Sequence, residues 1–299
     1  MKQEKRKMSF SWKTARNHAL RVLGMNQRNL DYIYPNNARK DFPVADDKIV
    51  TKEIMKRVGV PVPETYRVYS HFYELRGLES DLGSYHDFVI KPSQGRGGGG
   101  IIVIADRQGE DWVGVSGKVY SIHDIKKHIS DIMFGVYSFD LHDRALIEAR
   151  IVQHEEMNVL SPFGLADVRV ILHRDEPVLS MTRIPTKASE GRANLHQGAV
   201  GAGIDLASGR TVHAVLKGDP VDKHPDTGVD LIGRAVPYWD RVVEISLRAA
   251  RAVPLKYLGV DSSISQGGPV LLEINVRPGL EIQNANVRGL RSILEGART

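Results

Sequence analysis

The chain has 299 residues, of which 41% are hydrophobic and 26% charged, proportions typical of a globular protein that buries a core. It contains no cysteine and no apolar run near the roughly 20 residues of a membrane span, which excludes disulfides, cysteine nucleophiles and a membrane-spanning helix and favours a cytoplasmic protein. Its net charge of +5 is spread along the chain without interleaved aromatic residues, so we expect no nucleic-acid partner.

The first part of the chain is predicted to contain two helices and a strand. Residues 10–24 carry apolar side chains at helical spacing, and Gly24 ends this pattern. A polar, Asn-rich stretch then leads to Pro43. Asp46 or Asp47 is expected to cap a second helix that stops at Gly59. After a proline-containing linker, residues 66–69 have the pattern of a strand.

The rest of the chain is predicted to consist mainly of strands. Helices are expected at about 122–133 and after Pro237. Strands are expected at 87–90, 101–104, 145–151, 166–173, 177–184, 257–264 and 269–276. Because many short strands alternate irregularly with helices, the pattern favours an α+β architecture with largely antiparallel sheets over a doubly wound parallel sheet.

A glycine-rich loop joins two of these strands in the sequence FVIKPSQGRGGGGIIV of residues 88–103. Glycines let backbone N–H groups approach a phosphate, and Lys91 adds a positive charge at the start of the loop. Four consecutive glycines exceed the needs of a hairpin turn, so we interpret the loop as a phosphate-binding lid rather than a flexible turn. The lysine precedes the glycines and a strand follows them, which excludes both the Walker A pattern and the dinucleotide fingerprint.

A second candidate set consists of Asp261, Glu273 and Asn275. Glu273 and Asn275 lie two positions apart on one strand and therefore point to the same face. If this strand pairs with the one before it, Asp261 joins them. Two carboxylates and an amide oxygen suit Mg²⁺, with Mn²⁺ as an alternative ion. A solvent-facing charged edge is the competing interpretation, although the flanking isoleucine and leucine indicate partial burial.

A third candidate set contains two arginines and a histidine. Arg169 follows Asp167, and Arg192 lies in the sequence GRANLHQG of residues 191–198. Either guanidinium could stabilise phosphoryl charge or hold a substrate carboxylate. A surface salt bridge is the competing interpretation for each arginine, and we expect a non-catalytic role for His196.

Taken together, these motifs resemble the ATP-grasp superfamily, and specifically the RimK-like alpha-L-glutamate ligases. The resemblance extends from about residue 46 to 289 and follows the family's order. It comprises the Asp-Lys pair at 47–48, the loop behind Lys91, LIEARI at 146–151, DVR at 167–169, GRANLHQG at 191–198, GVD at 259–261 and LEINVRPGL at 272–280. It implies a fold in which two α/β subdomains clamp ATP between mostly antiparallel sheets.

The resemblance also implies roles for individual residues. The lysines would contact the phosphates, residues 148–151 would line the adenine, and Asp167 would lie near the sugar. The implied ATP-binding residues are Lys48, Lys91, Gly97, Gly98, Glu148, Ala149, Arg150, Ile151, Asp167 and Asn194. The implied catalytic residues, on the side of the phosphoryl group or the acceptor, are Arg169, Arg192 and Arg277. Magnesium would be held by Asp261, Glu273 and Asn275.

The N-terminus departs from the family pattern, in which a full α/β domain precedes the Asp-Lys helix. Only 47 residues precede Lys48 here, so we expect a shortened helical extension at 1–45 instead. The ATP-grasp domain would then span 46–299, with a lid-bearing subdomain at about 62–150 and a metal-bearing subdomain at about 151–299. Because the missing domain often helps to bind the carboxylate substrate, a second copy of the chain or a partner protein is expected to complete the site.

The expected function is an ATP- and magnesium-dependent carboxylate–amine ligase that works through an acyl-phosphate. It would add glutamate or another amino acid to a peptide, protein or small-molecule acceptor. Two other functions stay open. The chain could be an ATP-binding regulatory or assembly protein without turnover, or a kinase that acts on a sugar or a carboxylate.

Overall fold

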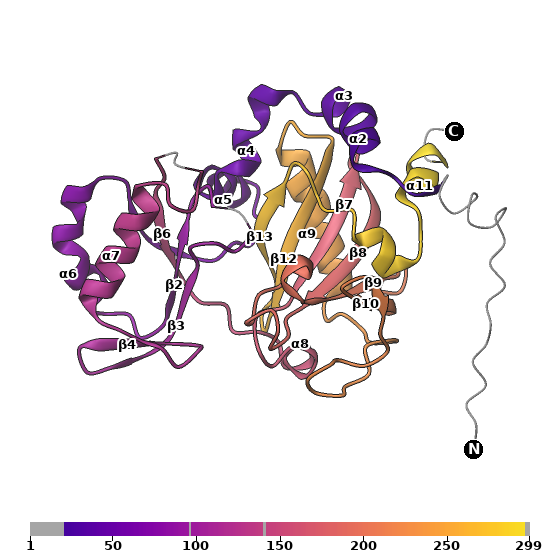
Figure 1. Ribbon diagram of the computed structural model, residues 1–299. Helices are drawn as coiled ribbons and strands as arrows, with labels where there is room; N and C mark the ends of the chain where they lie inside the picture. The colour runs from indigo at the N-terminus through magenta and orange to yellow at the C-terminus, as the bar shows by residue number, and fades with distance from the viewer. Residues whose placement is uncertain (1–20, 96, 140–141, 297–299) are drawn as a thin grey trace, which may run out of the picture.

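The computed structural model describes residues 21–95, 97–139 and 142–296 and shows two lobes, each built on one sheet (Figure 1). The smaller sheet has the strand order β1-β6-β2-β3-β4-β5, and the larger sheet has the order β11-β10-β9-β8-β7-β12-β13. Every pairing between these strands is antiparallel. The predicted α+β architecture with largely antiparallel sheets is therefore confirmed.

All of the predicted strands are present. The strands of the small lobe are β1 (Thr65–Tyr69), β2 (Phe88–Pro92), β3 (Ile102–Gln108), β4 (Asp111–Gly114), β5 (Val119–Tyr120) and β6 (Ala145–Glu148). Those of the large lobe are β7 (Asp167–His173), β8 (Glu176–Ile184), β9 (Val200–Ile204), β10 (Thr211–Leu216), β11 (Asp219–Pro220), β12 (Tyr257–Ser265) and β13 (Gly268–Asn275). The strands β4, β5 and β9 to β11 were not predicted, because they are short or rich in glycine and carry little apolar alternation.

The predicted helices at 46–59, at 122–133 and after Pro237 are confirmed as α5 (Lys48–Arg57), α7 (Ile122–Met133) and α9 (Trp239–Ala252). Asp47 caps α5 by accepting a hydrogen bond from the backbone N–H of Ile49 at 3.0 Å. The predicted helix at 10–24 lies largely outside the described residues. The other helical segments are α2 (Met25–Gln27), η1 (Arg28–Ile33), α3 (Tyr34–Asn36), η2 (Arg39–Asp41), α4 (Pro43–Asp46), η3 (Phe72–Gly77), α6 (Leu78–Leu82), α8 (Glu155–Leu160), η4 (Leu195–Gln197), α10 (Ile282–Asn286) and α11 (Leu290–Gly296).

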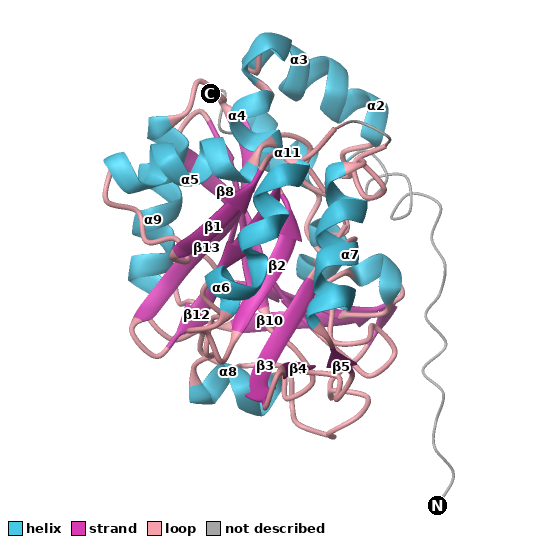
Figure 2. Ribbon diagram, turned by 90° about the vertical axis from the view of Figure 1, so that its left-hand side faces the viewer, coloured by secondary structure: helices cyan, strands magenta, loops and turns pink. Residues whose placement is uncertain are grey.

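Each lobe has its own hydrophobic core. In the small lobe, α6 and α7 cover the face of the sheet that points away from the large lobe (Figures 1 and 2). Ile125, Ile129 and Ile132 recur at helical spacing along α7 and are fully buried in that core. In the large lobe, α9 packs on β7, β12 and β13. The described N-terminal residues share this larger core, since Tyr32 and Ile33 are buried in it.

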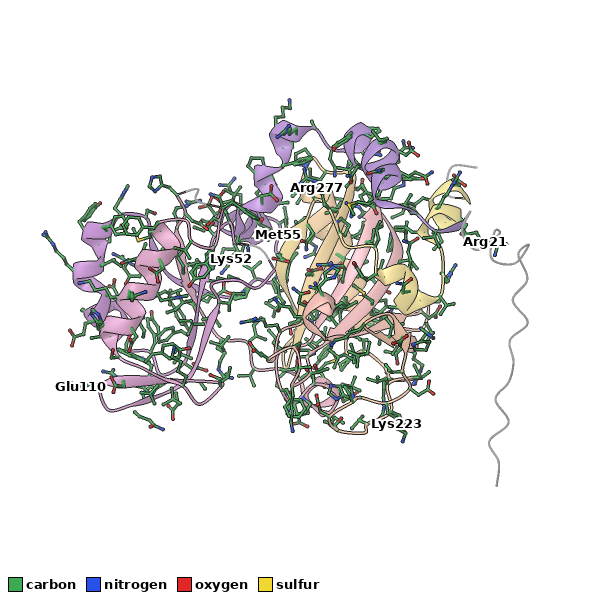
Figure 3. The ribbon with its side chains drawn as sticks, viewed as in Figure 1. Arg21, Lys52, Met55, Glu110, Lys223 and Arg277 are labelled. Carbon is green, nitrogen blue, oxygen red and sulfur yellow. The ribbon has the colours of Figure 1, made fainter. Side chains whose placement is uncertain are left out.

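Helix α5 lies at the junction of the two lobes. Its Met55 is fully buried in the core of the large lobe, and the helix contacts α9 and β13. Lys48 and Lys52 of the same helix bond to residues of the small lobe. Figure 3 shows Lys52 and Met55 on this helix. Within the described ranges, no helix is long and apolar enough to cross a membrane.

Candidate functional site at the junction of the lobes

The acidic residues of the site are brought together by strand register. Strand β12 lies between β7 and β13, so Asp261 is directly opposite Arg169 on one side and Glu273 on the other. One strand further along the sheet, Asp167 of β7 is directly opposite Arg183 of β8. Residues directly opposite each other point to the same face of a sheet. The register therefore gathers three carboxylates and two guanidinium groups on one surface of the large lobe.

Arg169 and Arg183 bind the two buried carboxylates of this surface. Arg169 donates to Asp261 from Nε at 2.7 Å and from Nη2 at 2.5 Å. Arg183 donates to Asp167 at 2.6 and 2.5 Å and, through Nη2, to Asp261 at 2.7 Å. Arg183 was not among the predicted site residues. Its place opposite Asp167 became evident only with the register of β7 and β8, because the two positions lie 16 residues apart.

The two buried aspartates differ in their pKa values. Burial acts to raise the pKa of Asp261, but the positive charges of Arg169 and Arg183 outweigh it and lower this pKa. Burial also raises the pKa of Asp167. The positive charge of Arg183 opposes this shift, and the negative charge of Asp261 adds to it. Asp261 is therefore the carboxylate that holds its negative charge most firmly.

The structure brings the side chains of Asp261, Glu273 and Asn275 together, and their role as metal ligands stays a prediction. The side-chain amide of Asn275 donates to Asp261 Oδ2 at 2.9 Å and to Glu273 Oε1 at 3.2 Å. Asp261 is fully buried, whereas the side chain of Glu273 is 34% exposed. The donor set fits Mg²⁺, a hard ion that takes few protein oxygens and completes its shell with water and phosphate. Among the described residues, no cluster of three or more His, Cys, Asp or Glu side chains suited to a metal is present.

Lys48 connects these acids with the glycine-rich loop. Its Nζ donates to the carbonyl of Gly95 at 2.8 Å and lies 3.9 Å from Glu273 Oε2. Burial lowers the pKa of Lys48, and the negative charge of Glu273 opposes this effect. The lysine thus bridges a loop of the small lobe and a predicted metal ligand of the large lobe.

Lys91 pairs with Glu148, and a second lysine shares that carboxylate. Lys91 Nζ lies 2.5 Å from Glu148 Oε1, and Lys52 Nζ lies 2.6 Å from Glu148 Oε2. All three side chains are buried. Lys52 was not among the predicted site residues. Its spacing of four residues from Lys48 places both lysines on one side of α5, which was the available signal.

The N-terminus of α5 is fixed to the segment that follows β2. Asp47 accepts from Ser93 Oγ at 2.5 Å and from Arg144 Nη2 at 2.5 Å. The backbone N–H of Lys48 donates to the carbonyl of Ser93 at 3.0 Å. These bonds place Lys48 beside the start of the glycine-rich loop.

The glycine-rich loop joins two paired strands, as predicted, and touches the large lobe. Gly97 and Gly98 have φ angles of +63° and +80°, a region that glycine occupies readily. Asn194 of the large lobe directs its amide at the carbonyl of Gly97, 3.4 Å away. Arg192 is half-exposed and lies 3.6 Å from Glu190. The segment that contains Arg192 and Asn194 therefore faces the loop across the junction.

The predicted adenine-lining segment leaves β6 at the same junction. The backbone N–H of Ala149 donates to the carbonyl of Glu64 at 2.9 Å, and Arg150 Nε donates to Asp87 at 2.9 Å. Ile151 follows and is half-buried. The role of residues 148–151 beside adenine stays a prediction.

Arg277 lies outside the cluster of paired charges. It is exposed, and its guanidinium carbon lies 4.9 Å from the centre of the Phe42 ring. His196 lies 3.1 Å from Glu281 Oε1. Of the three predicted catalytic arginines, Arg169 is thus bound to a carboxylate, whereas Arg192 and Arg277 present exposed cations.

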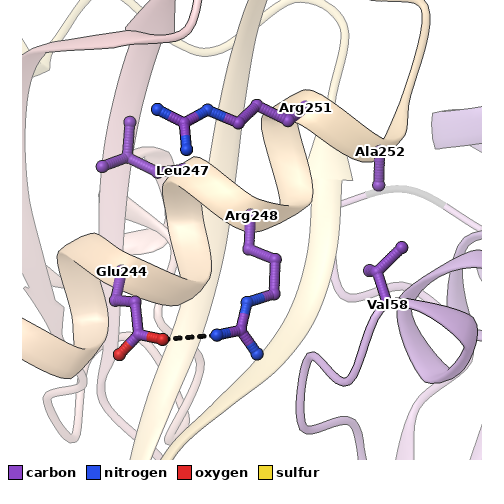
Figure 4. Close-up of a pocket in the computed structure, with 6 residues that line it drawn as sticks. All are labelled: Val58, Glu244, Leu247, Arg248, Arg251 and Ala252. Atoms are coloured by element: carbon purple, nitrogen blue, oxygen red, sulfur yellow. Dashed lines mark hydrogen bonds and ion pairs between the residues drawn. The ribbon is translucent and has the colours of Figure 1, made fainter.

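Cavities elsewhere on the molecule do not include these residues. One of about 350 Å³ lies between Val58 and the outer side of α9 (Figure 4). Its Arg248 pairs with Glu244 on the same helix at 2.5 Å. Another, of about 740 Å³, lies between β10 and the last two helices. Neither cavity contains the lysines or acids of the junction.

Comparison with known proteins agrees with this arrangement. A family model described as sugar-transfer associated ATP-grasp matches residues 27–298. A protein named probable alpha-L-glutamate ligase, from Trichodesmium erythraeum (strain IMS101), is 26% identical over 235 residues, which is 79% of this chain and 57% of that protein. The ribosomal protein bS6–L-glutamate ligase of Escherichia coli O7:K1 is 24% identical over 250 residues, which is 83% of this chain and 61% of that protein.

A solved structure of D-alanine–D-alanine ligase from Bacillus anthracis, complexed with ATP, aligns at 15% identity with a TM-score of 0.45 and covers 84% of this chain and 64% of that one. The chain spans 57 to 61% of the length of the two curated relatives. The family model covers most of the chain, and the predicted resemblance to the ATP-grasp superfamily and its fold is confirmed. The chain belongs to the sugar-transfer associated ATP-grasp family.

Proposed function

We propose that the chain is an ADP-forming ligase that joins a carboxylate to an amine at the junction of its two lobes. The observation that carries this proposal is the position of Lys48. Its ammonium group lies between the carbonyl of Gly95 in the glycine-rich loop and the carboxylate of Glu273. A polyphosphate held by such a loop would meet the lysine on one side and the predicted metal ligands on the other.

The residues of the chain would act mainly by positioning groups and stabilising charge. Lys48 and Lys91 would bind the phosphates, and the loop that contains Gly97 and Gly98 would exclude water from them. Magnesium, when bound by Glu273 with its two neighbours, would neutralise phosphate charge. Arg192 and Arg277 would attract the anionic carboxylate substrate, because both side chains reach solvent.

The reaction would proceed in two transfers. A carboxylate oxygen of the substrate attacks the γ-phosphorus of ATP, and ADP leaves. The amine then attacks the acyl carbon of the acyl-phosphate, and phosphate leaves as the amide forms. Neither transfer requires a protein nucleophile, in keeping with a chain that has no cysteine.

The substrates are inferred from the relatives and the family. Two relatives are named as glutamate ligases, one of them acting on ribosomal protein bS6, so L-glutamate and a peptide or protein acceptor are the first candidates. The family is described as sugar-transfer associated, so amino sugars and uronic acids are the second. We propose a cytoplasmic location, because the reaction consumes ATP.

Glu273→Ala tests the proposal. The wild-type chain should bind an ATP analogue in the presence of magnesium and release ADP when an acid and an amine are present. The variant should stay folded and release ADP at least about 100-fold more slowly. ADP release at the wild-type rate by the variant would contradict the assignment of the metal site.

A further inference from the structure

The buried cluster of Lys52, Lys91 and Glu148 carries more positive charge than its one carboxylate can neutralise. Glu148 uses one oxygen for each lysine, at 2.6 Å to Lys52 and 2.5 Å to Lys91. The exposed fractions of Lys52, Lys91 and Glu148 are 4%, 6% and 4%, so water cannot screen these charges effectively. Two ammonium groups and one carboxylate leave a net charge of +1 in a nearly dry site.

The geometry points to Lys52 as a positioning residue for the nucleotide: we propose that it offsets the charge of Glu148, so that Lys91 presents a net positive charge to the phosphates of ATP. This inference rests on the proposed binding of phosphate by Lys91. It assigns Lys52 no contact with the nucleotide. Its effect is transmitted through the carboxylate that the two lysines share.

The net charge of the cluster depends on Lys52. With Lys52 removed, Lys91 and Glu148 would form a neutral pair, and an approaching phosphate would meet the negative carboxylate together with the ammonium group. With Lys52 present, the carboxylate is shared between two donors, and the cluster keeps an excess positive charge next to β2, the strand that leads into the glycine-rich loop. The excess charge costs stability in the empty site, and an anionic ligand would relieve that cost.

The fold holds Lys52 in this position. Lys52 lies on α5, whose N-terminus is bonded to the segment after β2 through Asp47 and Ser93. Glu148 is the last residue of β6, which pairs with β2 so that Leu146 is opposite Lys91. Both lysines therefore approach Glu148 from fixed elements of the structure. Burial also lowers the pKa of Lys52 to about 8, and the carboxylate of Glu148, which Lys52 shares with Lys91, offsets this shift only in part.

A set of variants tests the inference through binding rather than turnover. The dissociation constants of a non-hydrolysable ATP analogue and of adenosine are measured by competition with magnesium present. The constant for adenosine divided by that for the analogue isolates the contribution of the phosphates, and a low ratio means weak binding of the phosphates. Lys52→Met should weaken the binding of the analogue about tenfold relative to adenosine. The double variant with Lys52→Met and Glu148→Gln restores the net charge of +1 and should recover the wild-type ratio. Lys52→Arg, which keeps the charge, should resemble the wild type.

The results of these variants distinguish a failure of the inference about Lys52 from a failure of the proposed function. A wild-type ratio in Lys52→Met would overturn the inference alone. A ratio that stays low in the double variant would also overturn it, because Lys52 would then contact the nucleotide itself. If Lys52→Met does not fold, Glu148→Gln decides, since its net charge of +2 must give a ratio at least as favourable as that of the wild type. Failure of the wild-type chain to bind the analogue would instead contradict the proposed function.

Discussion

Arg169 and Asp261 face each other across β7 and β12 and form a two-point ion pair, with Nε to Oδ1 at 2.7 Å and Nη2 to Oδ2 at 2.5 Å. Both side chains are buried, and Arg183 adds a third bond to the same carboxylate. The carboxylate of Asp261 therefore bonds to two guanidinium groups as well as forming part of the predicted metal site. Arg169, which was predicted to act on the substrate, has a structural partner here.

The first prediction concerns stability. Asp261→Asn leaves Arg169 and Arg183 with too little negative charge, and breaking a buried ion pair in this way costs about 3–5 kcal/mol. Glu273→Gln is the matched control. Its side chain is 34% exposed and its partner Lys48 is 3.9 Å away, so its loss should cost under about 1 kcal/mol. Urea unfolding measures both, and equal costs would contradict the structural role of Asp261.

The second prediction concerns the glycine-rich loop. Gly100 has a φ of +75°, and a Cβ atom there would lie 2.7 Å from the ring of Tyr137. Gly100→Ala should therefore displace the loop and raise the KM for ATP about tenfold. Gly109→Ala is the matched control, because its φ is +66° but nothing lies within 4 Å of its Cβ position. If both variants have the same KM for ATP, the loop does not act on the nucleotide.

The third prediction concerns Arg277. Because its guanidinium is exposed and could bind a carboxylate, we expect Arg277→Gln to raise the KM for the carboxylate substrate about tenfold. The affinity for the ATP analogue should stay unchanged. Arg241→Gln is the matched control, since Arg241 also lies over an aromatic ring, that of Tyr238 at 5.6 Å. The measurement uses the acid and amine that give turnover. A loss confined to ATP affinity would place Arg277 on the nucleotide side instead.

The fourth prediction concerns pH. Burial lowers the pKa of Lys52 to about 8; the charge of Glu148 opposes this shift, and the charges of Lys91 and Lys56 add to it. Below this pKa the cluster carries its net charge of +1, and above it the cluster is neutral. The affinity for the ATP analogue should therefore fall as the pH rises through about 8.

The double variant with Lys52→Met and Glu148→Gln provides the comparison. It lacks the ammonium group of Lys52, so its affinity should fall less between pH 7 and 9 than that of the wild type. Parallel pH profiles would show that Lys52 does not control the binding of phosphate.

The sequence predicts the strand–loop–strand around Lys91 and the pairing of the strands that carry Asp261 and Glu273, because both depend on local alternation and short turns. It does not predict which charges pair. The bond between Asp167 and Arg183 depends on the register of β7 and β8. A shift of that register by one residue would turn one of the two side chains to the other face of the sheet. Lys52 was missed for a related reason, since its partner Glu148 lies 96 residues away. Long-range pairing, rather than local pattern, decides these contacts.

The N-terminal extension shows the same limit. Residues such as Asn36 and Asn37 have no apolar periodicity that would predict their place in the fold. In the structure the side chain of Asn37 donates to the carbonyl of Tyr257 at 2.7 Å and is buried, which ties the extension to β12. This contact depends on tertiary packing, so the composition of the segment alone could not indicate it.

The mass of the product decides whether the chain is a ligase that joins a carboxylate to an amine. The chain is incubated with ATP, magnesium and pairs drawn from L-glutamate, other amino acids, peptides, amino sugars and uronic acids, and ADP and products are measured together. A ligase releases ADP only when both members of one pair are present, and its product has the mass of the two substrates less one water. A product that keeps the phosphate would identify a kinase, and nucleotide binding without ADP release from any pair would identify a binding protein; either result would exclude a ligase.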